Sequence, residues 1–305
     1  MTPWESCQDE TSRSWEAILE ESLNEFSMNL YAYLSQSQPM KNLLFSPISI
    51  SVVLTHLLLG KRGLPVQSMQ FYDADPVKFT NSSEVNVEMI NSWVAKQRNN
   101  KIKELVDSVP AHTELVLLNA VYFNGQWKMK FDAKSKMFPF VKLNGDTVLV
   151  PVLYSAKYKL AMQYVPALMA QVAMFPLSGE SSLFILLPPT AKLSDLQLVE
   201  GKMTDKAVSQ MVEQMNQVSP QATELPLGLS ELFDSANLCG LYPDNELLLT
   251  DAHHWAFLSL TEQGVEAGGA TSLSFSSFPA PRPFLMILWS DQAKAPLFVG
   301  RVTEP

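Results

Sequence analysis

Hydrophobic and polar residues alternate in an unusual place near the carboxyl end of the chain. Two apolar runs, Trp255–Leu260 and Phe284–Trp289, predict buried strands, and about 20 residues join them where about 4–6 are usual. From Val265 to Phe275, mostly apolar residues occupy every second position and small or polar residues occupy the others, which is typical of a strand. The pattern predicts a strand held outside its sheet; a flexible linker with a chance alternation is the alternative.

The composition of this connection divides it into two parts. The run Ala267–Ala270 (AGGA) carries almost no side-chain bulk, so its backbone can fit between two existing strands. The run Phe278–Pro283 contains prolines that cannot donate ladder hydrogen bonds, which excludes an interior strand. We therefore expect the first part to be a strand held outside its sheet and Phe278–Pro283 to be a stiff exposed segment.

Hydrophobic periods elsewhere predict an α+β protein. Helical periods or caps indicate helices over Trp15–Leu34, Ile48–Leu59 (begun by Ser46-Pro47 and ended by Gly60), Ser83–Arg98 and Asp205–Val218. Apolar runs indicate further strands over Glu114–Phe123, Val148–Leu153, Gln171–Phe175, Leu183–Leu187 and Leu297–Val302. Residues 61–80 and 219–235 show no sustained period. Helices come early and hairpin-spaced strands late, so the sheets are expected to be mostly antiparallel.

Bulk composition narrows the classes of partner. The 305 residues are 47% hydrophobic and carry a net charge of −9, which makes nucleic acid an unsuitable partner. No apolar run reaches the roughly 18 residues of a membrane span, and no signal-peptide pattern begins the chain. Cys7 and Cys239 are compatible with one long-range disulfide or with two free thiols. Asn81-Ser82-Ser83 is a glycosylation sequon, a tripeptide that is also common by chance.

Residue patterns that carry catalysis are missing. The sequence has no GxSxG, HExxH, CxxC or phosphate-loop motif, and it indicates no cofactor. His253 and His254 point to opposite faces of a strand, so they cannot bind a metal together. A lysine cluster favours a solvated face over a polyanion site: Lys128, Lys130, Lys134, Lys136 and Lys142. These observations leave a binding module or an inhibitor, and not an enzyme.

Several motifs, in order along the chain, resemble those of the serpin family. They are Asn42–Ile50 (NLLFSPISI), Ile90–Lys96 (INSWVAK), Leu118–Trp127 (LNAVYFNGQW), Asn237–Leu241 (NLCGL), Glu262–Thr271 (EQGVEAGGAT), Pro283–Leu285 (PFL) and Leu297–Val302 (LFVGRV). The resemblance implies the serpin fold: mixed helices, a large central mostly antiparallel sheet, smaller sheets and an exposed reactive loop over 262–283. It implies one serpin domain over 14–305, after a polar tail of residues 1–13.

The resemblance also implies a mechanism, the suicide inhibition of serine proteases. A protease cleaves the reactive loop, and the freed hinge then inserts into the sheet as a new strand. The hinge residues would be Glu262, Gly264, Val265, Glu266, Ala267, Gly268, Gly269, Ala270 and Thr271. A polar cluster under the sheet opening would contain Ser46, Ser49, Asn119 and His254, and Trp127 would lie where insertion begins. Counting from the hinge places the reactive bond at Ser277–Phe278.

The chain departs from the family pattern in ways that bear on function. Lys61–Val85 is some 60 residues shorter than its family counterpart, and the segment after Pro226 is also shortened. Cys7 and Cys239 resemble members of two different family disulfides. The resemblance is greatest to a secreted, monomeric plasma branch that regulates complement and contact-system proteases, which prefer arginine where this loop has Ser277. A non-inhibitory or inactive truncated serpin is therefore the alternative.

Overall fold

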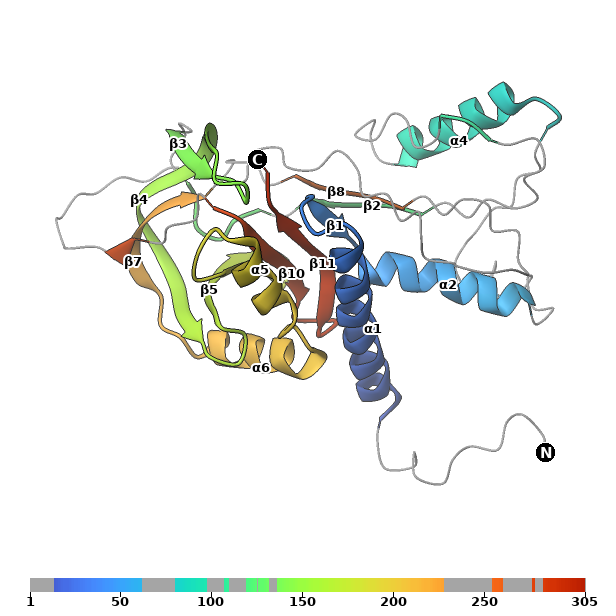
Figure 1. Cartoon of the computed structure of the whole chain (residues 1–305). Coiled ribbons are helices and arrows are strands. Elements are labelled where there is room, and N and C mark those ends of the chain that lie inside the picture. The colour runs from blue at the N-terminus through green and yellow to red at the C-terminus, as the bar shows by residue number, and fades with distance from the viewer. Residues whose placement is uncertain are drawn as a thin grey trace.

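The computed structural model confirms the α+β class (Figure 1). It describes residues 14–61, 80–97, 107–109, 119–124, 126–131, 136–227, 254–259, 276–277 and 282–304. For residues 119–124, 254–259 and 276–277 it describes the backbone.

A large sheet forms the body of the described structure. Nine strands take part, eight of them in the order β1-β11-β10-β6-β5-β4-β7-β9, while β3 pairs with β4 alone. All neighbours are antiparallel except β7 and β9. The strands are β1 (Leu43–Phe45), β3 (Lys136–Val141), β4 (Thr147–Val165), β5 (Ala170–Leu177), β6 (Ser181–Leu187), β7 (Gln221–Leu227), β9 (Ser276–Ser277), β10 (Phe284–Ser290) and β11 (Ala295–Val302).

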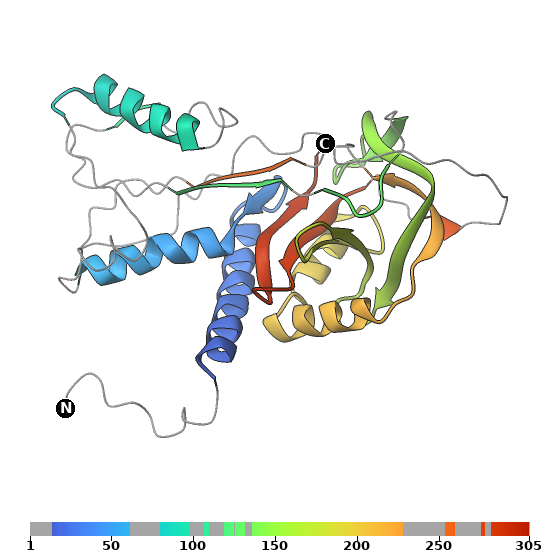
Figure 2. The same cartoon turned by 180° about the vertical axis from the view of Figure 1, so that it is seen from behind.

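A second sheet contains two described strands, β2 (Asn119–Asn124) and β8 (His254–Ser259), which run parallel. Figures 1 and 2 show this pair extending away from the large sheet, towards the side where α2 (Pro47–Lys61) and α4 (Ser83–Gln97) lie. α1 (Trp15–Ser37) packs along β11, and α6 (Asp205–Asn216) contacts α1 and β4. α5 (Leu193–Glu200) precedes α6 in the chain.

Helix ends follow the capping expected from their sequences. The Ser14 hydroxyl accepts a hydrogen bond from the Ala17 amide at 3.2 Å, and Thr204 accepts one from the Ala207 amide at 3.2 Å. In α6 the buried residues recur at helical spacing: Val208, Met211, Val212 and Met215. The helix predicted over Asp205–Val218 is therefore confirmed.

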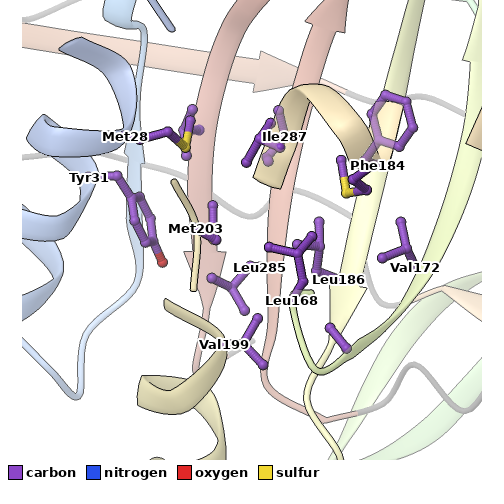
Figure 3. Packing of buried hydrophobic residues seen from close by; sticks show 14 of the residues in the cluster. Met28, Tyr31, Leu168, Val172, Phe184, Leu186, Val199, Met203, Leu285 and Ile287 are labelled. Atoms are coloured by element: carbon purple, nitrogen blue, oxygen red, sulfur yellow. The ribbon is translucent and has the colours of Figure 1, made fainter. Parts of the chain in front are cut away.

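Both faces of the large sheet are buried, which explains why its central strands read as continuous apolar runs. All of β6 is buried, and so is β10 up to Trp289. One face packs against α1, α5 and α6; Figure 3 shows Tyr31, Val199 and Leu285 in this layer. The other face packs against β3, the first half of β4 and the residues after β2.

The structure corrects several predicted boundaries. α2 continues to Lys61, so Gly60 lies inside the helix, where a glycine costs only about 1 kcal/mol. β4 runs on past Leu153 because it pairs with three different strands along its length. The 219–235 region contains β7, whose proline at 226 hid the strand pattern. β1, β3 and α5 were not predicted.

The first turns of α1 differ from the expected amphipathic helix. Trp15 is 80% exposed and Leu19 is 68% exposed, although both lie on the predicted apolar stripe. Further along, Leu30 and Leu34 are buried. The stripe therefore meets the core only in the second half of the helix, where α1 contacts β11.

Gly300 lies at a close approach between β1 and β11, where it pairs with Leu44. A Cβ at this position would lie 2.3 Å from the Leu43 carbonyl oxygen, which is backbone and cannot move independently. We expect Gly300→Ala to destabilise the fold by about 2–3 kcal/mol, through overpacking. Urea denaturation measures the loss, with Gly201→Ala as the control, because its Cβ would come no closer than 3.3 Å to another residue. Equal stability of the two variants would contradict the prediction.

Candidate functional site

The two-stranded sheet places the start of the reactive loop. β2 and β8 pair in parallel from Asn119 opposite His254 to Asn124 opposite Ser259. Both strands therefore end at the same edge of the sheet. The hinge predicted from Glu262 to Thr271 follows Ser259 by three residues, so the chain enters the hinge from this edge, although the hinge itself lies outside the described residues.

Elements that carry the predicted polar cluster lie next to one another in the fold. Asn119 and His254 are direct register partners at the first position of each strand. α2 contacts β2, and β1 contacts β8. Ser46 and Ser49 at the start of α2 are both buried, and the Ser46 hydroxyl accepts from the Ser49 amide at 3.4 Å. The cluster stays a prediction, since the side chains of Asn119 and His254 are not described.

Trp127 lies three residues after β2 and is 4% exposed. Its ring packs edge-on against Phe131 at 5.3 Å and Phe175 at 5.9 Å between ring centroids. An isolated bridge to Leu177 ties it to the end of β5. Trp127 therefore connects the carboxyl end of β2 to the large sheet, on the side where the hinge begins.

Residues at the far end of the reactive loop return to the large sheet. Ser276 pairs with Thr223, and Ser277 pairs with Glu224, in a short parallel ladder between β9 and β7. Sequence reasoning expected an exposed segment over Phe278–Pro283 and did not foresee this ladder. Phe278, the other residue of the predicted reactive bond, lies outside the described residues.

Arg282 is bound beside the beginning of β10. Its guanidinium Nη1 donates to the Pro189 carbonyl oxygen at 3.1 Å, and its buried Nε has no hydrogen-bond partner among the described residues. Burial lowers the pKa of Arg282 from its ordinary value, because desolvation disfavours the charged form. The side chain therefore anchors the carboxyl end of the loop to the end of β6.

Other predicted positions are exposed or lie outside the described residues. Asn81 is exposed just before α4, and the Ser83 hydroxyl of the same sequon donates to the Val109 carbonyl oxygen at 2.6 Å. Lys128 is exposed, and Cys7 and Cys239 lie outside the described residues. In the described part of the chain, no three His, Cys, Asp or Glu side chains are placed to hold a metal. None of the described helices is long and apolar enough to cross a membrane.

A buried ion pair was missed by sequence reasoning. Arg301 of β11 is completely buried, and its Nη1 lies 2.7 Å from Oε1 of Glu200, which ends α5. The Tyr31 hydroxyl donates to the same carboxylate oxygen at 2.9 Å. Arg301 also donates to the carbonyl oxygens of Ser35, Gln38 and Lys41, at and beyond the carboxyl end of α1. A charged residue inside an otherwise apolar strand was the signal that could have revealed it.

Solved structures of serpins share this fold. A human glycosylated kallistatin structure matches with a TM-score of 0.76 at 21% identity, over 96% of this chain and 99% of that one. A tumour-suppressing serpin matches with a TM-score of 0.74 at 18% identity, over 94% and 99% of the two chains. These matches confirm the predicted fold.

The chain belongs to the serpin family. The family model described as "Serpin (serine protease inhibitor)" matches residues 21–70 and 65–305. Human plasma protease C1 inhibitor is 33% identical over 371 residues, covering 98% of this chain and 74% of that protein. Factor XIIa inhibitor of Bos taurus is 32% identical, covering 100% and 79%, and alpha-2-antiplasmin of Mus musculus is 28% identical, covering 97% and 73%.

These matches also locate the internal shortening. The alignment to the human protein spans 371 positions, against 305 residues in this chain, so at least 66 aligned positions have no counterpart here. The two segments of the family match overlap at residues 65–70. This overlap lies inside Lys61–Val85, the region that the sequence analysis expected to be shorter than in other members of the family.

Proposed function

We propose that this protein inhibits serine proteases by offering residues 262–283 as a substrate and then inserting Gly264–Phe275 between β2 and β8. The observation that carries the proposal is the direct parallel pairing of these two strands, with the loop continuing from the carboxyl end of β8. A segment that turns back after Ser259 runs antiparallel to β8. Because β2 is parallel to β8, the same segment is antiparallel to β2 and can hydrogen-bond to both strands.

The chemical step belongs to the protease. Its serine Oγ attacks the carbonyl carbon of Ser277, and the peptide bond to the next residue breaks. The protease histidine carries the proton from Oγ to the leaving amine, so that the chain ending at Ser277 stays attached as an ester. This protein contributes a carbonyl and a strand but no catalytic group, which is why we propose an inhibitor rather than an enzyme.

Several finer assignments follow from the same proposal. Small hinge residues from Gly264 to Thr271 would enter the sheet, Trp127 would lie where insertion begins, and Ser46, Ser49, Asn119 and His254 would support the pair from below. We propose one domain over residues 14–305, an extracellular monomer, and glycosylation at Asn81. The names of the relatives support serine proteases as partners of this chain. They point to complement and contact-system proteases in particular.

A non-inhibitory serpin is the second candidate, and one observation favours it. Within the described residues the receiving sheet has two strands, and the chain lacks at least 66 positions of its human relative. If the missing positions include strands that brace the sheet, cleavage would yield a cut chain without a trapped protease.

Incubation with serine proteases separates these candidates. We expect the chain to form a complex with at least one trypsin-, chymotrypsin- or elastase-type protease that survives boiling in SDS. Its mass should equal the protease plus residues 1–277, since the remaining residues are released on denaturation. Recovery of cleaved chain alone, with every protease class, would support the non-inhibitory candidate.

A further inference from the structure

Arg282 is the one basic residue in the loop from Glu262 to Pro283. Trypsin-like proteases hold a lysine or arginine side chain, fully extended, in an acidic S1 pocket. Arg282 is bound to Pro189 through Nη1, and its Nε is buried. Two residues later, Phe284 is fully buried and paired with Val302. A protease could draw Arg282 into its S1 pocket only by detaching the chain from the sheet.

Ser277 is presented differently. Its backbone is extended in β9, which pairs with β7 on one side and is the last strand in the order of the described sheet. Proteins commonly recognise extended peptides by adding a strand along a free edge. Within the described residues no strand pairs with the other side of β9, and its backbone groups can be offered there to a protease without disturbing β7.

Ser277 is small and uncharged, which restricts the kind of protease S1 pocket that can accept it. If Ser277 occupied an acidic S1 pocket, the carboxylate of the protease would be buried without a cation, at a large cost in binding free energy. A deep apolar pocket would be left mostly empty, because serine buries much less apolar surface than the larger side chains that such a pocket holds. A shallow, uncharged pocket of the elastase type avoids both losses.

We infer that the proteases captured by this loop are elastase-type serine proteases that cleave after Ser277, and not the arginine-specific proteases expected from the resemblance. This inference rests on the proposed inhibitory function and specifies its target class. Arg282 then has an anchoring role at the carboxyl end of the loop.

The test uses the full chain with pancreatic elastase, trypsin and chymotrypsin. It measures the rate of SDS-resistant complex formation and, by mass spectrometry, the cleaved bond. We expect elastase to react at least 100-fold faster than the other two and to release a fragment beginning at residue 278. Ser277→Arg should reverse the preference in favour of trypsin, whereas Arg282→Gln should leave the preference for elastase over trypsin unchanged.

Different outcomes separate this inference from the proposed function. Complex formation between the unaltered chain and trypsin, abolished by Arg282→Gln, would overturn the inference, as would faster complex formation with chymotrypsin. Cleavage by elastase after Ser277 without any stable complex would support the assigned bond and protease class. That same result would refute the inhibitory function.

Discussion

Cleavage of the chain after Ser277 is expected to raise its melting temperature by roughly 12–24 °C. β2 and β8 are joined by six register pairs, and insertion of a strand replaces this one ladder with two. The net gain is about six backbone hydrogen bonds, or about 6 kcal/mol at ~1 kcal/mol each. Each kcal/mol shifts the melting temperature of a chain of this size by about 2–4 °C. Scanning calorimetry before and after complete cleavage measures the shift.

Two matched variants show whether the gain comes from insertion. Ala267 lies on the mostly apolar face of the loop's alternation, whereas Ala270 lies on the other face. Ala267→Glu should abolish the rise, because a carboxylate would be buried without a partner, while Ala270→Glu should retain it. An unchanged melting temperature after complete cleavage of the unaltered chain would show that β2 and β8 do not accept a third strand.

A gain of this size has a consequence for the uncleaved protein. About 6 kcal/mol is comparable with the whole free energy of unfolding of many domains, which is roughly 5–15 kcal/mol. The form with β2 paired to β8 would therefore not be the most stable arrangement of the chain. It would persist because the barrier to insertion is high, as in other kinetically stable proteins.

Replacing Arg301 with methionine is expected to destabilise the protein by about 3–5 kcal/mol. The Glu200 carboxylate would be left buried without its cation, and three carbonyl oxygens at and beyond the end of α1 would lose a donor. Among the described residues, the Tyr31 hydroxyl would be the one remaining hydrogen-bond donor to the Glu200 carboxylate. Urea denaturation of the uncleaved protein measures the change in free energy of unfolding.

The control is the exposed ion pair between Lys294 and Glu20. Its nitrogen and oxygen are 3.8 Å apart, and the lysine side chain is 68% exposed, so Lys294→Gln should change the stability by less than about 1 kcal/mol. Combining Arg301→Met with Glu200→Gln should recover part of the loss, because no buried charge is then unpaired. Equal losses from Arg301→Met and Lys294→Gln would contradict the prediction.

The alternating sequence around the loop was informative because it conflicts with its position. Val265–Phe275 has the pattern of a strand but occupies the place of a connection. The central strands were also predicted well: β10 begins at the predicted Phe284 and β11 ends at the predicted Val302. Burial on both faces of the sheet produces unbroken apolar runs, which are easy to recognise in a sequence.

Other parts of the site could not be predicted from local pattern. β7 contains Pro226, and β9 has only two residues, so neither leaves a recognisable period. The sequence shows Arg282 to be basic, but its contact with Pro189, 93 positions away in the chain, depends on how β6 and β10 lie together.

The sequence by itself determined the class of fold and the family motifs, and it predicts a small-residue hinge just after β8. Those features rest on side-chain size, hydrophobicity and spacing, which are local properties. Only the tertiary structure decided that β2 and β8 are paired directly and in parallel, that Ser277 pairs with Glu224 in the last strand of the described sheet, and that Arg282 and Arg301 are held by distant partners. Strand pairing and the burial of charge depend on residues far apart in the chain, and their geometry is fixed when the whole core packs.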